Sequence, residues 1–506
     1  MKPFLKYIMI AFSFFALAFV FFSFNSEKAA AKRPNIIYIL ADDLGYGDVS
    51  CYQASGKIHT PNIDLLAAEG MRFTDMHSPS GVCTPTRYGI ITGEYPWRSK
   101  LPVGVLRGYS RNLIDPEKGT VAELLKKYDY ETAVVGKWHL GIDWILSDKA
   151  VEKGLGKAPG YGIQSEMDTS DINFDKKPTF GPNNLGFNYS YILPASLDMP
   201  PYCYLENHQL TSLPTSFTSG NKLESGYTGP FWRAGKMSPD FDFYEVLPTF
   251  INKAKAFILN QKKEKPFFLY LPLAAPHTPW VPKKEYVGSS KAGEYGDFTR
   301  QVDAAVGELL KVLKEKGIEK NTMVIFTSDN GPYWRENFTE QFQHRAAGPF
   351  RGMKGDAYEG GHRIPFIVRW PEKIKKGSVS DAIGCQTSLL GTLRELLSDK
   401  DPKFDRKDSY SILPDLLGKT NPSNTEKPII HSSSKGYFGI RMGDWKLIDQ
   451  LGSGGFTAPD KENPTPGGPK VQLYNLKSDP SEKENVALKY PEKTAELLAK
   501  LAEIKK

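Results

Sequence analysis

Cysteine and histidine are scarce in this chain, which has four of the first and eight of the second among its 506 residues. The cysteines show no Cys-x-x-Cys spacing and the histidines no His-x-x-x-His pair, so the usual spacing of a zinc or dithiol redox site is absent. With so few cysteines, the fold must be stabilised by a packed core and not by disulfides. The cysteines are Cys51, Cys83, Cys203 and Cys385.

Dense runs of lysine and arginine are also missing, which argues against a nucleic-acid partner. The formal net charge of +7 suits a polyanionic substrate and equally suits a protein with neutral partners. The apolar share of 40% and the charged share of 24% are ordinary for a globular protein. Because 506 residues exceed what one hydrophobic core usually organises, we expect one large and one small domain.

One long apolar run lies near the N-terminus, from Tyr7 to Phe24, behind Lys2 and Lys6. Small residues at 29–31 offer a cleavage site, so residues 1–31 are predicted to be a signal peptide. The run is near the lower length limit of a membrane span, which keeps an uncleaved membrane anchor as the alternative. No cysteine follows directly, so a bacterial lipoprotein is not expected. We expect export, to the periplasm or the extracellular space, or to the secretory or lysosomal route in a eukaryote.

Predicted strands and helices alternate along residues 32–398. Short apolar runs rich in β-branched and aromatic residues predict buried strands at 34–41, 131–135, 265–273 and 322–327. Apolar residues at helical spacing predict helices at 62–69, 120–127, 243–260 and 298–315. This alternation predicts an α/β fold with a large, mostly parallel central sheet and helices on both faces.

The pattern changes in the last hundred or so residues. Short strands at 428–431, 437–441, 445–449 and 471–476 precede a helix at 491–505. They predict a small C-terminal subdomain over residues 399–506, an antiparallel sheet with one helix, beside a larger domain over residues 32–398. Residues 141–239 are rich in Gly, Pro, Tyr and Asn, and are predicted to form long loops over the functional edge of the sheet.

Polar side chains recur just beyond the carboxyl ends of the predicted strands, at the edge where open α/β sheets bind ligands. We therefore expect one crevice to collect Asp42, Asp43, Lys137, His139, His277, Asp329 and Asn330. Carboxylate and amide oxygens are hard ligands that suit Ca²⁺ or Mg²⁺. Acidic pairs are also common in turns, and residues 329–332 alone would pass as one.

The most informative motif is the segment Cys83 to Arg87, CTPTR, followed by Thr92-Gly93. An isolated cysteine is usually a small buried hydrophobe. As Cys-x-Pro-x-Arg, however, the segment resembles the sequence by which type I sulfatases mark a cysteine for oxidation to formylglycine.

Further blocks extend this resemblance over nearly the whole mature chain. They are 33–47 (RPNIIYILADDLGYG), 136–141 (GKWHLG), 275–279 (APHTP), 328–332 (SDNGP), 351–365 (RGMKGDAYEGGHRIP) and 473–487 (LYNLKSDPSEKENVA). By these motifs the chain is identified as a member of the arylsulfatase-like, formylglycine-dependent sulfatases, within the alkaline phosphatase superfamily. The fold implied is alkaline phosphatase-like.

The resemblance also implies a site. Hydrated formylglycine, made from Cys83, would be the nucleophile, Arg87 would orient it, and Lys137 would contact it and the sulfate. Lys354 would bind the sulfate or the leaving oxygen. The modification requires a formylglycine-generating enzyme or an anaerobic sulfatase-maturating enzyme as a partner. The implied ligands of a Ca²⁺ or Mg²⁺ ion are Asp42, Asp43, Asp329, Asn330 and an oxygen of modified Cys83.

The negative charge of a sulfate ester and the proton transfers that its hydrolysis needs are consistent with these assignments. A sulfate ester is anionic and repels nucleophiles, and a cation with two lysines offsets that charge. His277 can protonate the leaving oxygen, and His139 can take the proton whose loss lets sulfate depart. Both histidines follow strands at the same edge, whereas a lone histidine is more often structural. His362 follows no such strand and is a candidate substrate contact only.

The chain departs from the family pattern at residues 386–392, where many relatives have an Asp followed by an aromatic-Pro-Thr segment. We expect this helix to lie away from the catalytic blocks. The departure therefore puts the local packing in doubt, and not the chemistry.

Two alternatives to a sulfatase are open. A phosphomonoesterase or phosphodiesterase of the same superfamily would need a Ser or Thr nucleophile and two metal ions held by several histidines. A catalytically dead carbohydrate-binding relative would lack competent residues, whereas the matched positions all hold them. Export, the aromatic loops and the basic charge favour a sulfated polysaccharide or oligosaccharide, and the similarity leans toward galactose or N-acetylgalactosamine glycans. The sulfate position and exo or endo action stay open.

Overall fold

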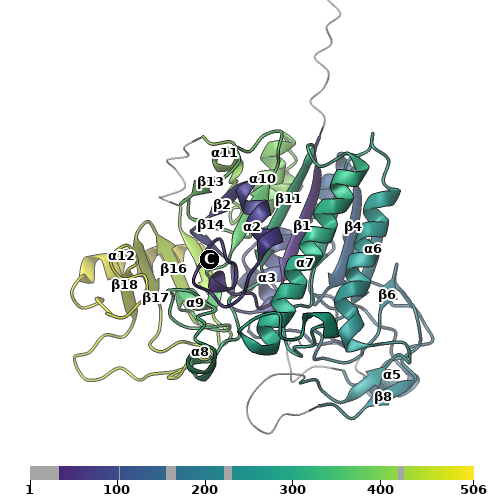
Figure 1. Ribbon diagram of the computed structural model, residues 1–506. Coiled ribbons are helices and arrows are strands. Elements are labelled where there is room, and N and C mark those ends of the chain that lie inside the picture. The colour runs from purple at the N-terminus through teal and green to yellow at the C-terminus, as the bar shows by residue number, and fades with distance from the viewer. Residues whose placement is uncertain (1–32, 102, 155–166, 222–230, 420–426) are drawn as a thin grey trace, which may run out of the picture. The chain divides into compact units, whose positions relative to one another are not determined.

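A ten-stranded mixed sheet lies at the centre of the fold, in the order β13-β2-β12-β11-β1-β10-β4-β5-β6-β7 (Figure 1). The computed structural model describes residues 33–101, 103–154, 167–221, 231–419 and 427–506. Residues Asn35–Lys506 form one compact unit. The predicted signal peptide, residues 1–31, lies outside the described residues. Within the described ranges, no helix is both long and apolar enough to cross a membrane.

Five neighbouring strands in the middle of the sheet run parallel, which confirms the predicted α/β class. They are β11 (Thr322–Ser328), β1 (Asn35–Ala41), β10 (Phe267–Pro272), β4 (Glu131–Lys137) and β5 (Tyr189–Leu193). Antiparallel pairs enter toward the two edges. The edge strands are β12 (Phe366–Arg369), β2 (Met71–Phe73), β13 (Ser378–Ser380), β6 (Leu205–Glu206) and β7 (Gln209–Leu210).

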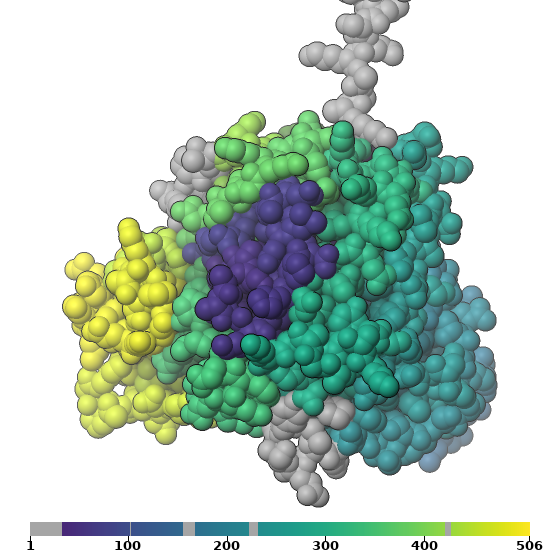
Figure 2. Space-filling model, viewed as in Figure 1, coloured from purple at the N-terminus to yellow at the C-terminus, as the bar shows by residue number. Residues whose placement is uncertain are grey.

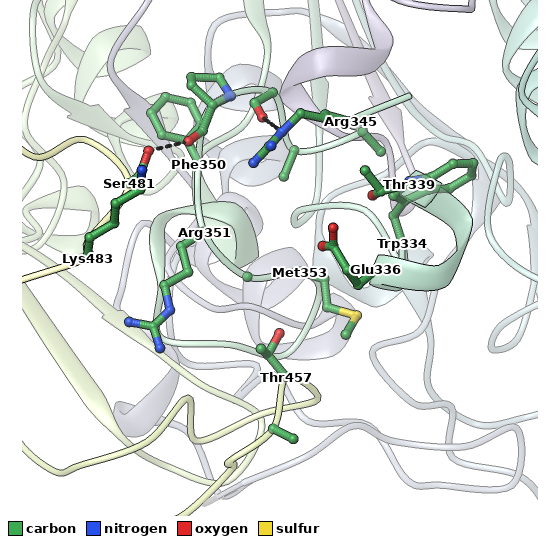
Figure 3. Close-up of a pocket in the computed structure, with 16 residues that line it drawn as sticks. Trp334, Glu336, Thr339, Arg345, Phe350, Arg351, Met353, Thr457, Ser481 and Lys483 are labelled. Carbon is green, nitrogen blue, oxygen red and sulfur yellow. Dashed lines mark hydrogen bonds between the residues drawn. The ribbon is translucent and has the colours of Figure 1, made fainter. Parts of the chain in front are cut away.

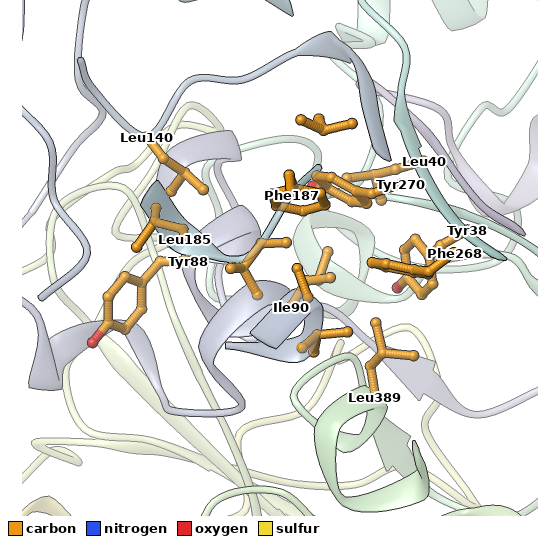
Figure 4. Packing of buried hydrophobic residues seen from close by; sticks show 14 of the residues in the cluster. Tyr38, Leu40, Tyr88, Ile90, Leu140, Leu185, Phe187, Phe268, Tyr270 and Leu389 are labelled. Carbon is orange, nitrogen blue, oxygen red and sulfur yellow. The ribbon is translucent and has the colours of Figure 1, made fainter. Parts of the chain in front are cut away.

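Burial on both faces explains why the middle strands are continuous apolar runs. In β1, NIIYILA, the even-numbered residues from 36 to 40 belong to one core cluster and the odd-numbered residues from 37 to 41 to another. A central parallel strand has no solvent face, so neither set can be polar. Figure 4 shows the first cluster, in which Tyr38 and Tyr270 of the sheet pack near Ile90 and Leu389 of the covering helices.

Helices cover both faces of the sheet, as predicted. One face carries α2 (Pro61–Ala68), α6 (Val246–Asn260) and α7 (Gly293–Lys316). The opposite face carries α3 (Cys83–Thr92), α4 (Val121–Lys127) and α10 (Ser388–Leu396). Local signals set their ends: a capping box of Thr120 and Glu123 opens α4, and Gly317, at φ 67°, closes α7 in the left-handed conformation.

The predicted small antiparallel sheet and its helix are also confirmed. Strands β15 (Ile429–Ser432), β16 (Phe438–Met442), β17 (Trp445–Ile448) and β18 (Gln472–Asn475) pair in that order, and α12 (Pro491–Lys505) packs on β16 and β17. In the space-filling view these yellow residues lie directly against the green middle of the chain (Figure 2). Phe404 and Ile412 pack in the core of the large sheet. The domain boundary after residue 398 stays a prediction.

The expectation of long loops at residues 141–239 is wrong in part. The CTPTR motif begins a buried helix, α3, at residues 83–92. Residues 141–239 contain strand β5 of the large sheet, the hairpin β8 (Ser216–Thr218) and β9 (Gly235–Met237), and α5 (Asp148–Glu152). The remaining elements are β3 (Met76–His77), β14 (Gly384–Cys385), α8 (Glu336–Phe342), α9 (Glu359–His362), α11 (Leu413–Leu416), and the 3-10 helices Tyr46–Asp48, Pro96–Arg98, Thr169–Asp171, Pro182–Leu185, Phe243–Glu245, Lys284–Tyr286 and Pro402–Phe404.

Candidate active site

The carboxyl ends of the parallel strands bring the predicted polar residues together. Ala41 of β1 is in register with Ser328 of β11, so Asp42 and Asp329 leave the sheet side by side. Lys137 is the last residue of β4. The glycine before it, Gly136, has φ 136°, and a β-carbon there would lie 1.9 Å from the carbonyl oxygen of Pro272. Glycine thus permits the close approach of β4 to β10 that places the lysine.

Helix α3 presents Cys83 and Arg87 to these strand ends. Cys83 is its first residue, and its Sγ lies 3.6 Å from Asp42 Oδ1. Arg87 follows one turn later on the same face, because residues four apart are neighbours on a helix. Pro85 falls in the first turn, where its missing N–H costs no hydrogen bond. The spacing Cys-x-Pro-x-Arg is therefore compatible with a helix that begins at the cysteine, and it places Cys83 and Arg87 on one face.

Arg87 is fully buried and joins three parts of the site. Its Nε and Nη2 donate to Asp329 Oδ2, at 3.1 and 2.7 Å, and its Nη1 donates to the Lys137 carbonyl at 2.8 Å. Burial, followed by the charge of Asp42, raises the pKa of Asp329 to about 6, although Arg87 opposes the rise. The arginine therefore keeps ionised a carboxylate that burial alone would neutralise.

Two buried lysines pair with the two other carboxylates. Lys137 Nζ donates to Asp42 Oδ2 at 2.6 Å, and Lys354 Nζ donates to Asp43 Oδ2 at 2.7 Å. Burial acts to raise the pKa of Asp42, but Lys137 and the other cations around it hold that pKa well below its usual range. Burial likewise acts to lower the pKa of Lys354, and Asp43 raises it. Both lysines are thus cationic donors at the site.

The oxygen donors fit a hard divalent cation. Asn330 donates its Nδ2 to Asp43 at 2.7 Å, and its buried Oδ1 has no hydrogen-bond partner among the described residues. A buried amide oxygen without a partner is costly unless it coordinates a cation or accepts a hydrogen bond from water. Ligand atoms of Asp42, Asp43, Cys83 and His277 lie within 4.8 Å of one another, so two of the four are a sulfur and a nitrogen. Asp329 lies outside this group, and its oxygens accept from Arg87 and from the Asp43 N–H.

The two histidines at the site differ in which ring nitrogen is engaged. His139 donates from Nε2 to the Leu106 carbonyl at 2.7 Å, and its Nδ1 is buried with no described partner. Burial, with the charge of Lys137, lowers the pKa of His139 well below its ordinary value, so the ring is a neutral acceptor at Nδ1. His277 engages the Thr278 carbonyl through Nδ1, and its Nε2 lies 3.6 Å from Asp43 Oδ2.

Ser196, Asp198 and Arg233 belong to this site and were missed from sequence. Ser196 Oγ accepts from Lys137 Nζ at 3.1 Å and lies 3.4 Å from His277 Nδ1. Asp198 Oδ1 is 4.0 Å from His277 Nδ1, and its carboxylate pairs with Arg233. Ser196 and Asp198 follow β5, so recognising that strand would have pointed to them as it did for the other strand ends.

His362 is not brought to the site. It is fully buried in a second cluster, where its Nδ1 is 3.0 Å from His77 Nδ1 and its Nε2 is 3.0 Å from Lys446 Nζ. Its ring also stacks on His431, with centroids 3.5 Å apart. This placement does not support the interpretation of His362 as a substrate contact. The cluster instead ties the segment that carries Lys354 to the C-terminal sheet.

The expectation that residues 386–392 lie away from the catalytic blocks is wrong. Gln386 Nε2 donates to the Ser328 carbonyl at 2.9 Å, directly before Asp329. Helix α10 packs against α3, and Leu390 lies against Gly93 at the end of that helix. The departure from the family pattern therefore falls on the packing behind both Asp329 and Cys83.

Buried carboxylates, lysines, an arginine and histidines lie together at the carboxyl edge of a mostly parallel sheet with the alkaline phosphatase-like fold, an arrangement that suits a hydrolase of anionic esters. The family model described as Sulfatase matches residues 34–399. The chain belongs to the sulfatase family and is a sulfuric ester hydrolase.

This chain is similar to known sulfatases over almost its full length. The chain is 36% identical to N-acetylgalactosamine-6-O-sulfatase of Bacteroides thetaiotaomicron, covering 94% of both chains. It is 31% identical to human arylsulfatase A, covering 94% of this chain and 88% of that protein. A solved sulfatase from work on glycosaminoglycan metabolism by B. thetaiotaomicron has a TM-score of 0.78 at 35% identity, covering 94% of this chain and all of that one. A phosphonate monoester hydrolase of Agrobacterium radiobacter shares the fold, with a TM-score of 0.59, 17% identity and coverage of 94% and 95%.

Proposed function

We propose that this sulfatase removes sulfate from a sulfated polysaccharide or oligosaccharide of the galactose or N-acetylgalactosamine type. Similarity to the bacterial N-acetylgalactosamine-6-O-sulfatase over 94% of both chains supports the substrate class. The proposed nucleophile is formylglycine made from Cys83, beside a Ca²⁺ or Mg²⁺ ion. The observation that carries this proposal is the position of Cys83, at the start of α3 and 3.6 Å from a carboxylate of the oxygen cluster.

An unmodified cysteine would be a poor nucleophile here. Burial raises the pKa of the Cys83 thiol, although the two lysines near it oppose the rise, so the reactive thiolate is disfavoured. Hydrated formylglycine supplies a hydroxyl nucleophile in its place, and a second hydroxyl whose deprotonation expels sulfate. Cys83 is only 2% exposed, so the maturation enzyme is expected to act before α3 is buried.

The side chains of this chain have separate tasks in the proposed reaction. Asp42, Asp43, Asp329 and Asn330 would hold the cation, which would supply positive charge against the sulfate. Lys137 and Lys354 donate hydrogen bonds to sulfate oxygens, and these hydrogen bonds become stronger as charge develops in the transition state. His277 donates a proton to the leaving oxygen from Nε2 when its ring is an imidazolium, and His139 accepts a proton at Nδ1. Burial and Lys354 lower the pKa of His277, whereas Asp43 and Asp42 favour the imidazolium.

Export is part of the proposal. Residues 1–31 serve as the signal peptide, and the enzyme acts on glycans outside the cytoplasm. A maturation enzyme, of the formylglycine-generating or anaerobic type, is the proposed protein partner.

A substrate panel tests the proposal. Enzyme from a host with a maturation enzyme should release sulfate from galactose or N-acetylgalactosamine sulfates and from 4-nitrophenyl sulfate. The Cys83→Ala variant is the matched control and should release none. Faster hydrolysis of 4-nitrophenyl phosphate would favour a phosphatase, and no turnover of any ester by matured enzyme would favour a carbohydrate-binding relative.

A further inference from the structure

A large cavity lies beside the segment that carries Lys354 (Figure 3). Its volume is about 870 Å³, within the ~300–1,000 Å³ typical of ligand pockets. One wall comes from residues 334–353, directly before Lys354, and the other from residues 457–483 of the C-terminal part. Both walls belong to the same compact unit.

Positive charge predominates in this cavity. Arg345, Arg351 and Lys483 line it, and Glu336 is the acidic side chain among its lining residues. Like charges gathered in a hollow repel one another and concentrate an anion there. We call this site the basic cavity.

Backbone contacts hold two of these cations in place. Arg345 Nε donates to the Gly348 carbonyl at 3.1 Å. Arg351 Nη1 donates to the Glu482 carbonyl at 2.8 Å, and its guanidinium lies 4.0 Å from the centre of the Tyr358 ring. Each keeps further N–H groups for a ligand, because a guanidinium has five donors. Figure 3 shows Arg345, Arg351 and Met353 around the same hollow.

An exposed aromatic ring lies between the basic cavity and the catalytic segment. Phe456 is 47% exposed, and a β-carbon at Gly355 would lie 3.2 Å from its ring. The ring also contacts Tyr333, with centroids 6.1 Å apart. Thr457, the next residue, already lines the cavity. Phe456 thus offers an exposed apolar ring surface next to both the Lys354 segment and the basic cavity.

We propose that the basic cavity binds a second anionic sugar of the glycan chain whose sulfate ester lies at the catalytic site. Arg345, Arg351 and Lys483 hold its carboxylate or sulfate, and Phe456 supports the sugar between the two sites. This inference rests on the proposed function and adds that the substrate is a polyanionic chain and not an isolated sulfated sugar.

Steady-state kinetics with a long and a short substrate test the proposal that the basic cavity binds a second sugar. The substrates are a chondroitin 6-sulfate hexasaccharide and N-acetylgalactosamine 6-sulfate. Lys483→Ala should raise KM for the hexasaccharide relative to the monosaccharide by roughly two- to fivefold, as expected for one exposed charge contact. Adding Arg345→Gln should bring the ratio to roughly tenfold, and salt should reduce the difference. The control Lys314→Ala, an exposed lysine of α7, should leave the ratio at its wild-type value. A ratio for Lys483→Ala equal to that control would overturn the proposal.

Calorimetry separates this inference from the proposed function. The hexasaccharide should bind Cys83→Ala protein more tightly than the Cys83→Ala, Lys483→Ala double variant. If wild-type enzyme hydrolyses no glycan sulfate, the proposed function fails and this binding difference alone decides the inference. Equal binding by both variants would overturn it. If inorganic sulfate, at the same concentration of negative charge as the hexasaccharide, displaces the hexasaccharide completely, the cavity binds a free anion and the proposal is overturned.

Discussion

Replacing His277 by alanine should slow the hydrolysis of sulfate esters, and the loss should be larger for esters whose leaving group is more basic and needs a proton. Nδ1 of His277 is engaged with the Thr278 carbonyl, so Nε2 is the nitrogen that can serve the leaving oxygen. General acid catalysis is worth ~10²–10⁴-fold. A sugar alkoxide needs that help, whereas 4-nitrophenolate leaves unaided.

The structure allows the acid role to be separated from other losses. His277→Ala also removes the contact of Nε2 with Asp43, at 3.6 Å, but this loss is common to both substrates and cancels in a ratio. We expect kcat/KM for a glycan sulfate to fall ~10²-fold or more, and that for 4-nitrophenyl sulfate to fall at least roughly tenfold less.

The assay compares both substrates in His277→Ala and in the matched variant His139→Ala. Because His139 is assigned to sulfate expulsion, its loss should affect both substrates alike, as a burst of alcohol release followed by a stall. Equal losses on the two substrates in His277→Ala, with no burst in His139→Ala, would refute the assignment of roles.

Other predictions concern the cation, the buried arginine and pH. Asp329→Ala should abolish turnover, and chelation of the wild type should inhibit it until Ca²⁺ or Mg²⁺ is added; rescue by Zn²⁺ alone would contradict a hard-ligand site. Arg87→Met should destabilise the fold by ~3–5 kcal/mol, because it leaves Asp329 buried without its partner, and an unchanged thermal midpoint would refute this. Burial lowers the pKa of three clustered histidines, so the unfolded chain binds more protons as pH falls below 6.5, and stability is lost. Glu482, whose pKa burial raises to about 7, takes up its proton in the folded state and opposes part of this loss, so a reduced slope of stability against pH remains. His431→Gln should flatten that slope in unfolding measurements between pH 7 and about 5, and an unchanged slope would contradict it. The three histidines are His77, His362 and His431.

The middle strands and the site residues at their ends were predictable because burial on both faces imposes an unbroken apolar run. Strand β1 is such a run, and Asp42 follows it. Strand β5, YSYIL, is short and contains a serine, so its sequence does not stand out from the surrounding loops. Missing it also meant missing Ser196, which contacts Lys137.

Contacts between segments that are distant in the sequence account for the other differences between the predicted and the observed structure. No helix was predicted at residues 83–92, which contain Pro85 and Gly89, yet a proline in the first turn and close packing around the glycine suit a buried helix. His362 lies in the same sequence block as Lys354 but turns toward the C-terminal sheet, where Lys446 meets it. Gln386 reaches Ser328 across 58 residues of sequence. No local pattern encodes such pairings.

Mass spectrometry of the tryptic peptide that contains Cys83 tests directly whether this cysteine is converted to formylglycine. Fully active enzyme from a maturation-competent host should carry formylglycine at this position, a loss of ~18 Da from cysteine as SH₂ is exchanged for O. Fully active enzyme in which Cys83 is wholly unmodified would contradict the mechanism.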